Sequence, residues 1–163
     1  MFNIIKEQRD LQTRQLIGYQ ADGMFIPLDK ANSDYQKVQE YIANGGTVEP
    51  AFTLDDEKQF KLQELKNSYT DELNTTIAYK DSTYQADTNS YNEMIKVLST
   101  LPDSSTVLWY DIDNKAVELT KKDLLKLSYS ITERNQVLFN KLQKLKKLVK
   151  ESDNIDKLKN VIW

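Results

Sequence analysis

The sequence predicts an α+β fold that is mostly helical. We expect a small N-terminal β-hairpin region with a short helix, then a helical body with short hairpins and one long C-terminal helix. Apolar residues recur with a 3.6-residue period from 120 to 150, uninterrupted by Pro or Gly, which is typical of an amphipathic helix. Short runs of β-branched and aromatic residues flank turn sequences at several places, which is typical of hairpins.

Residues 1–50 are predicted to form a small β-rich docking region. Three strands are expected in it, at apolar runs near 2–5, 16–19 and 24–26. Asp22-Gly23 is a strong hairpin turn between the second and third strands, and Pro27 ends the third strand or marks it as an edge. A short helix is predicted over 33–43, because Asn32 or Ser33 can cap it and two glycines follow it. The extended stretch 47–50 is where we place the domain boundary.

Residues 51–163 are predicted to form a helical domain with hairpins near 78–85 and 106–119. Helices are expected over 54–74, from Asp87 or Thr88 to before Pro102, over 120–150 and, as a short amphipathic piece, over 155–163. Asp55, Asp56 and Glu57 lie in the first turn of the first of these helices, where acidic side chains suit the helix dipole.

The stretch 106–127 organises this domain as a tight hairpin that leads directly into the long helix. Asp113-Asn114, or the wider loop 111–115, supplies the turn, because Asp and Asn tolerate left-handed backbone and bond to their own main chain. Thr120 stands three residues before Asp123, which predicts a capping box with Asp in place of the usual Glu.

The apolar stripe of the long helix needs a partner. It consists of Leu124, Leu127, Ile131, Leu138, Leu142, Leu145 and Val149, and it is broken only at Arg134. A helix of this length is roughly 45 Å long, whereas a compact body of this size has a radius of gyration of about 15 Å. The 54–77 segment or the same helix of a neighbouring subunit could cover the stripe. The acidic balance of 54–93 and the basic balance of 120–150 favour such pairing.

Composition excludes several function classes. The chain has no Cys and no His, so disulfides, thiol nucleophiles, histidine bases and typical zinc sites are excluded. A net charge of −3 disfavours nucleic acid as a partner. The N-terminus lacks the apolar core of a signal peptide, and no apolar run is long enough for membrane insertion.

Several chemical signals have a simpler structural interpretation. Asp111, Asp113 and Asn114 could begin a calcium loop, but Lys115 occupies a ligand position and no Gly follows, so a turn is favoured. The acids at 55–57 could be paired for glycoside hydrolysis, but acids at a helix N-terminus are favoured. Trp109 could stack on a sugar and the lysines of 141–150 could bind phosphate. A core residue and a solvated helix face are favoured instead. We therefore predict no catalytic residue, no cofactor, no metal site and no enzymatic activity.

An aromatic-Gln-Ala-Asp sequence, a helix and a Trp-x-Asp-x-Asp-Asn-x-x-Val-x-Leu-Thr-x-x-Asp-Leu sequence follow one another in the second domain. Their positions are held by Tyr84, Gln85, Ala86, Asp87, Trp109, Asp111, Asp113, Asn114, Val117, Leu119, Thr120, Asp123 and Leu124. The stretch 84–127 resembles a domain of uncharacterised function found in bacteriophage tail and tail-fibre-associated proteins. The first domain is also similar to tail-fibre-linked segments, which often have Trp at the position of Tyr41.

The resemblance implies a structural component of a bacteriophage or prophage tail, fibre-associated or baseplate-peripheral, that acts by protein–protein binding. It would be made in the host cytoplasm and located in the virion, bound to other tail proteins and forming a homo-oligomer, with a trimer expected because tail fibres are commonly trimeric. Candidate partner-binding residues are Tyr19, Phe25, Tyr35, Tyr41, Leu138, Leu142 and Leu145. The alternatives are a tail-fibre assembly chaperone that the virion does not retain, and a carbohydrate-binding receptor module that uses Trp109 and Tyr110.

Overall fold

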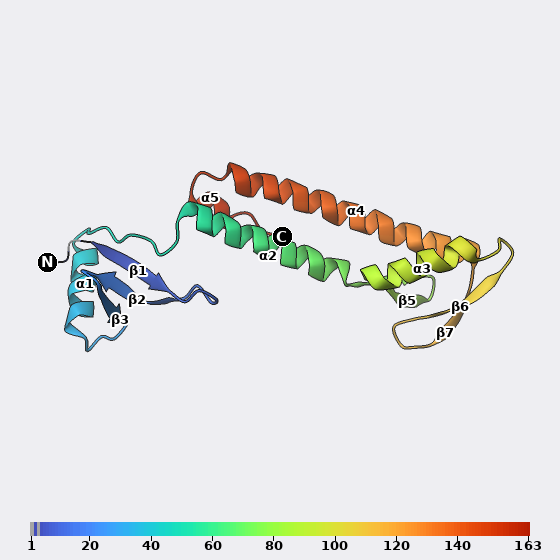
Figure 1. The fold of residues 1–163 in the computed structure, drawn as a ribbon, viewed down its shortest axis with the longest axis horizontal. Helices are drawn as coiled ribbons and strands as arrows, with labels where there is room; N and C mark the ends of the chain where they lie inside the picture. Colours follow the sequence, from blue (N-terminus) through green and yellow to red (C-terminus); the bar gives the residue numbers. More distant parts are fainter. Residues whose placement is uncertain (1, 3) are drawn as a thin grey trace. The chain divides into compact units, whose positions relative to one another are not determined.

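A computed structural model describes residues 2 and 4–163 (Figure 1). The chain forms two compact units, Met1–Asp56 and Glu57–Trp163. The division between them falls at 56/57, a little beyond the expected boundary at 50/51.

The fold class needs a correction. Half of the chain, 50%, is helical and 21% is strand, in several small antiparallel sheets and five helices among the described residues. The chain is therefore α+β, and the expectation of a mostly helical fold is wrong. The short runs of β-branched and aromatic residues beside turn sequences form paired antiparallel strands of four to six residues. Together these strands make a fifth of the chain.

Unit 1 is a three-stranded antiparallel sheet with one helix on it. Its elements are β1 (Ile5–Arg9), β2 (Leu16–Ala21), β3 (Met24–Pro27) and α1 (Ser33–Ala43). Asp22 and Gly23 both have positive φ, 47° and 81°, as a primed two-residue hairpin turn requires. The core between sheet and helix contains Ile5, Tyr19, Ala21, Ile26 and Val38. The first strand begins at Ile5 rather than near residue 2, and residue 3 of the expected range lies outside the described residues.

The stretch expected to be a linker also takes part in unit 1. The Glu49 N–H donates to the Ile5 carbonyl at 2.8 Å, and the Glu7 N–H donates to the Glu49 carbonyl at 2.8 Å. These bonds make a parallel bridge that covers the outer edge of β1.

Unit 2 is built on two long antiparallel helices, α2 (Leu54–Leu73), whose first three residues belong to unit 1, and α4 (Lys121–Glu151) (Figure 1). The Lys58 ammonium donates to the Lys150 carbonyl at 3.3 Å near one end, and the Arg134 guanidinium donates to the Leu73 carbonyl at 3.0 Å near the other. The first bond joins the start of α2 to the end of α4, and the second joins the end of α2 to the middle of α4, as expected for helices that run in opposite directions.

The last residues of the chain also lie against this pair. Helix α5 (Ile155–Lys159) follows α4, and both Leu158 and Val161 are buried. Trp163 donates its Nε1–H to a Glu72 carboxylate oxygen at 3.0 Å, and the Lys141 ammonium lies 4.3 Å from its ring centroid. Segments of the same chain therefore cover the apolar stripe of α4.

The other end of α4 carries the remaining elements. They are β4 (Thr76–Tyr79), β5 (Ser82–Gln85), α3 (Thr88–Thr100), β6 (Thr106–Tyr110) and β7 (Ala116–Thr120). The strands form two separate antiparallel hairpins, β4–β5 and β6–β7. Their shared core with α3 and α4 contains Tyr84, Ala86, Met94, Leu119, Leu124, Leu127 and Ile131.

Arg134 lies where the apolar stripe is broken. Its guanidinium donates to the carbonyl oxygens of Leu73, Thr75 and Ala86 at 3.0, 3.0 and 2.8 Å, and to the Asn135 side chain. Burial lowers the pKa of this guanidinium, and the nearby carboxylate of Glu72 opposes that shift. One side chain thus ties both the α2–β4 and the β5–α3 connections to the middle of α4.

We expect Arg134→Met to lower the free energy of unfolding of unit 2 by about 2–3 kcal/mol, because three carbonyls lose a charged donor. Urea unfolding followed by tryptophan fluorescence measures this unit, since Trp109 and Trp163 both lie in it. The matched control is Lys144→Met on an exposed position of the same helix, with an expected change within about 0.5 kcal/mol. Equal losses for the two variants would contradict the role of Arg134.

Candidate functional site

The turn of hairpin β6–β7 is built by two of the motif residues. The Asn114 N–H donates to the Asp111 carbonyl and the Asp111 N–H donates to the Lys115 carbonyl, both at 3.1 Å. Asn114 has a φ of 58°, a left-handed conformation that Asn tolerates. The Asp111 carboxylate accepts from the N–H groups of Asp113 and Lys115 at 3.0 and 2.9 Å. Asp111 and Asn114 therefore close a three-residue loop, 112–114.

The two faces of this hairpin differ. Trp109 is half-buried, and it packs with Val107 and Val117 against the core of unit 2. Leu108 and Tyr110 lie on the opposite face, where their exposed fractions are 60% and 59%. Trp109 is thus mainly a core residue, and its two neighbours offer the accessible apolar surface.

Thr120 and Asp123 form the capping box of α4. Asp123 also accepts from the Tyr79 hydroxyl at 3.1 Å and lies 2.8 Å from the Lys80 ammonium. The bond from Lys80, then that from Thr120, holds the pKa of Asp123 well below its usual range, and burial together with Asp123 raises the pKa of Tyr79. No local sequence pattern points to Tyr79 and Lys80, because only tertiary packing brings the β4–β5 turn to this helix end.

The other two acidic residues of the motif, Asp87 and Asp113, differ in their hydrogen bonds. Asp87 caps α3, accepting from the N–H groups of Asn89 and Ser90 at 2.8 and 3.1 Å. Hydrogen bonds from the Ser90 side chain and backbone lower the pKa of Asp87. Asp113 is exposed, and no described residue bonds to its carboxylate. The acids at 87, 111 and 123 therefore organise caps and turns.

A groove of about 410 Å³ lies beside the hairpin. One wall is 108–111 of β6 and its loop, together with Asn114. The other wall comes from the end of β5 and the first turns of α3, through Gln85, Asn89, Ser90 and Glu93. These lining residues include two carboxylates and no Lys or Arg. The contribution of α3 was not foreseen, because no sequence signal places its first turns opposite β6.

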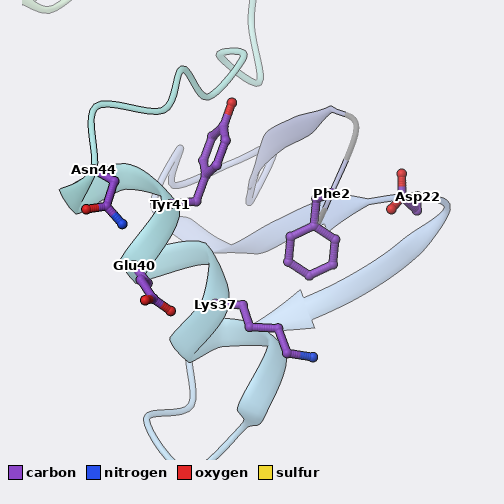
Figure 2. Close-up of a pocket in the computed structure, with 6 residues that line it drawn as sticks. All are labelled: Phe2, Asp22, Lys37, Glu40, Tyr41 and Asn44. Carbon is purple, nitrogen blue, oxygen red and sulfur yellow. The ribbon is translucent and has the colours of Figure 1, made fainter.

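A second cleft, of about 470 Å³, lies in unit 1 (Figure 2). Helix α1 supplies Lys37, Glu40, Tyr41 and Asn44, the last at its C-cap, while Phe2 and the β2–β3 turn residue Asp22 complete the lining. The Lys37 ammonium is paired with Asp34 at 2.7 Å. The cleft combines two aromatic rings with charged groups at its rim.

Several of the expected partner-binding residues pack inside the fold of this chain. Tyr19 is buried and stacks on Tyr35 with ring centroids 6.3 Å apart. Leu138 and Leu142 are buried and Leu145 is half-buried, because α2 and 155–163 lie along α4.

Two of these residues remain accessible. Tyr41 lines the unit 1 cleft, and Phe25 is 57% exposed on the open face of the sheet. Gly18 makes room for the Phe25 ring, since a Cβ there would stand 2.6 Å from it.

The described residues form neither a metal site nor a membrane-spanning helix. No group of three or more acidic side chains among them could hold a metal ion. None of the helices formed by residues 4–163 has the length and apolar character needed to cross a membrane.

These features define a two-unit α+β protein whose motif residues make turns, caps and core. Residues 56–160 match the family described as a domain of unknown function (DUF4376), and the chain belongs to that family. The match covers nearly all of unit 2. No curated protein matches the chain, and no solved structure matches it.

We expect the stabilising effect of Asp123 to be lost in acid. A carboxyl whose pKa is lower in the folded than in the unfolded state stabilises the fold above its unfolded pKa, near 4, and loses this effect as the pH falls further. The difference in Tm between the native protein and Asp123→Asn should be largest at about pH 7 and shrink towards about pH 2. Asp113→Asn, the exposed control, should show a small difference without this trend. A pH-independent difference for Asp123→Asn would contradict the account.

Proposed function

We propose that this protein is a structural component of a phage or prophage tail, fibre-associated or baseplate-peripheral, which acts by binding other tail proteins. The resemblance of 84–127 to tail-associated domains supports the setting. The observation that carries the binding role is the outer face of hairpin β6–β7. Leu108 and Tyr110 are 60% and 59% exposed there, and Ile112 in the adjoining loop is 43% exposed, while Asp111 and Asn114 are used in the turn.

Clustered exposed apolar and aromatic side chains are typical of protein-binding surfaces. The cluster lies on a hairpin whose other face is fixed to the core that α4 shares with it, so the surface is pre-formed. Unit 1 offers a separate surface at Phe25, which is exposed on the open face of its sheet. Two such surfaces suit a subunit that joins one partner through its N-terminal unit and another through its helical body.

The oligomer proposal now has a different basis. A homo-oligomer was expected because the α4 stripe needed cover, and a trimer because tail fibres are commonly trimeric, but α2 and 155–163 cover the stripe. Self-association would use exposed apolar residues outside this stripe, such as those of the hairpin face or of unit 1.

The groove gives the carbohydrate alternative a specific location. Tyr110, Asn89 and Glu93 place an aromatic ring, an amide and a carboxylate around one hollow, a combination able to hold a neutral sugar. A glycan array probed with the folded chain tests this alternative, and specific glycan binding abolished by Tyr110→Ala would favour it over the structural role.

We expect the chain to be present at a fixed copy number in particles purified from its phage or prophage and washed at high salt. Quantitative mass spectrometry against a known tail protein measures this. A chain that is abundant in the lysate and absent from washed particles would contradict the structural role and favour an assembly chaperone.

We also expect the double substitution Leu108→Ser and Tyr110→Ser to reduce incorporation into particles roughly tenfold or more, because buried aromatic and aliphatic anchors carry most interface energy. The matched control is Leu125→Ser with Tyr129→Ser on α4, where the same residue types are 57% and 63% exposed. Equal incorporation of both doubly substituted chains would exclude the hairpin face as the docking surface.

A further inference from the structure

The outer edge of β6 is an unpaired strand edge. The Asp111 N–H donates to the Lys115 carbonyl, which starts the β6–β7 ladder. Hydrogen-bonded and non-hydrogen-bonded pairs alternate along an antiparallel ladder, so Trp109 exchanges bonds with Val117. Leu108 and Tyr110 therefore direct their N–H and C=O groups away from β7. No backbone group elsewhere in the described chain pairs with them.

This edge faces the groove. The lining from β6 is 108–111, and the first turns of α3 lie across the hollow from it. At one end the Ile112 N–H donates to the Thr83 carbonyl of β5 at 2.9 Å, which ties the hairpin loop to the neighbouring hairpin. The unpaired N–H and C=O groups of Leu108 lie two residues, or roughly 7 Å, from those of Tyr110. This spacing equals the two-residue repeat of an extended polypeptide, so a partner strand could bond to both residues.

The edge of β6 lacks the usual protection against pairing. Natural edge strands carry Lys or Pro or are covered by another segment. In this chain β3 ends in Pro27, and Glu49 covers the edge of β1. The β6 sequence, Thr-Val-Leu-Trp-Tyr, has no Pro and no charge. An uncharged aromatic edge beside a groove is therefore suited to a partner strand.

The negative charge of the groove indicates what kind of partner strand it would bind. The groove is lined by the carboxylates of Asp111 and Glu93 and by no Lys or Arg. Among the described residues, Lys96 alone pairs with Glu93, three residues along the same exposed helix face, and such pairs are weak. Asp111 uses one carboxylate oxygen, Oδ1, for the turn. A cationic side chain entering the groove would be attracted by both carboxylates.

We propose that an extended segment of a partner protein, carrying a Lys or Arg, adds to β6 as a third strand in this groove. The edge groups of Leu108 and Tyr110 bond to its backbone, and their side chains flank its apolar residues on the outer face. Its basic side chain lies against Glu93 and Asp111. This inference rests on the proposed function and gives the chemistry of one partner.

Random-peptide display against the full chain, followed by fluorescence anisotropy with the selected peptides, tests the proposal. We expect the selected peptides to carry β-branched or aromatic residues at alternate positions and to contain a Lys or Arg. Leu108→Pro removes one edge N–H that the β6–β7 ladder does not use, and should weaken binding at least about tenfold. Leu108→Ala, which keeps that N–H, should weaken it less. Equal binding by both variants, or no peptide enriched over display against Leu108→Pro, would overturn the proposal.

Two further measurements do not depend on how Leu108→Pro folds. N-methylation of the alternate peptide amides that face β6 should abolish binding to the native chain, whereas methylation of the intervening amides should not. Equal effects of the two peptides would overturn strand pairing. Glu93→Gln should weaken binding about threefold or more, against no change for Glu133→Gln on α4. Equal effects of these two substitutions would overturn the basic-residue requirement.

Failure of this inference and failure of the proposed function are distinguishable. Particles that incorporate Leu108→Pro at the native copy number would overturn the strand-pairing site while the tail role stands. Absence of the native chain from all particles would overturn the tail role, and the peptide measurements would still decide the groove.

Discussion

The hydrogen bonds of Arg134 are the interaction on which unit 2 depends. The last carbonyls of a helix have no partners within it, and α2 ends at Leu73 with its chain turning directly into β4. The guanidinium supplies donors to Leu73 and Thr75, and a further donor to Ala86 just before α3 begins. The connections before and after the β4–β5 hairpin are thereby fixed at one level of α4. The position of the β4–β5 hairpin relative to α4 follows from this attachment, whereas β7 leads directly into α4 at Thr120.

The motif residues extend the same scaffold towards the hairpin. Asp123 joins the start of α4 to the β4–β5 turn, Asp87 caps α3, and Asp111 shapes the loop that reaches Thr83. Because these polar groups are used inside the unit, what the hairpin itself leaves for partners is its apolar outer face and the open edge of β6. The pattern specifies the fold of the domain more closely than it specifies a ligand.

Local signals in the sequence predicted local structure well. The Asp22-Gly23 turn, the loop at 111–115 and the capping box of Thr120 and Asp123 all occur where their short-range chemistry places them. Helix positions followed for the same reason, since periodicity and caps act over a few residues. The prediction of a mostly helical fold was wrong because the strand content was underestimated. Each strand is short, but together the strands form a fifth of the chain.

Contacts between segments that are distant in the sequence could not be predicted from it. Nothing in the apolar period of 120–150 distinguishes cover by α2 and the last residues of the chain from cover by another subunit, so Leu138 and Leu142 were assigned to an interface that the fold already fills. Tyr19 was likewise placed outside, although the pleat of β2 turns it towards α1. The groove depends on α3 facing β6, which no local pattern encodes.

The packed scaffold of unit 2 leaves the outer edge of β6 open in the free protein. Residue-resolved amide hydrogen exchange measures this most directly. The amides of Leu108 and Tyr110 should exchange quickly while the intervening Trp109 amide is protected. Protection of all three amides to the same degree would contradict the claim.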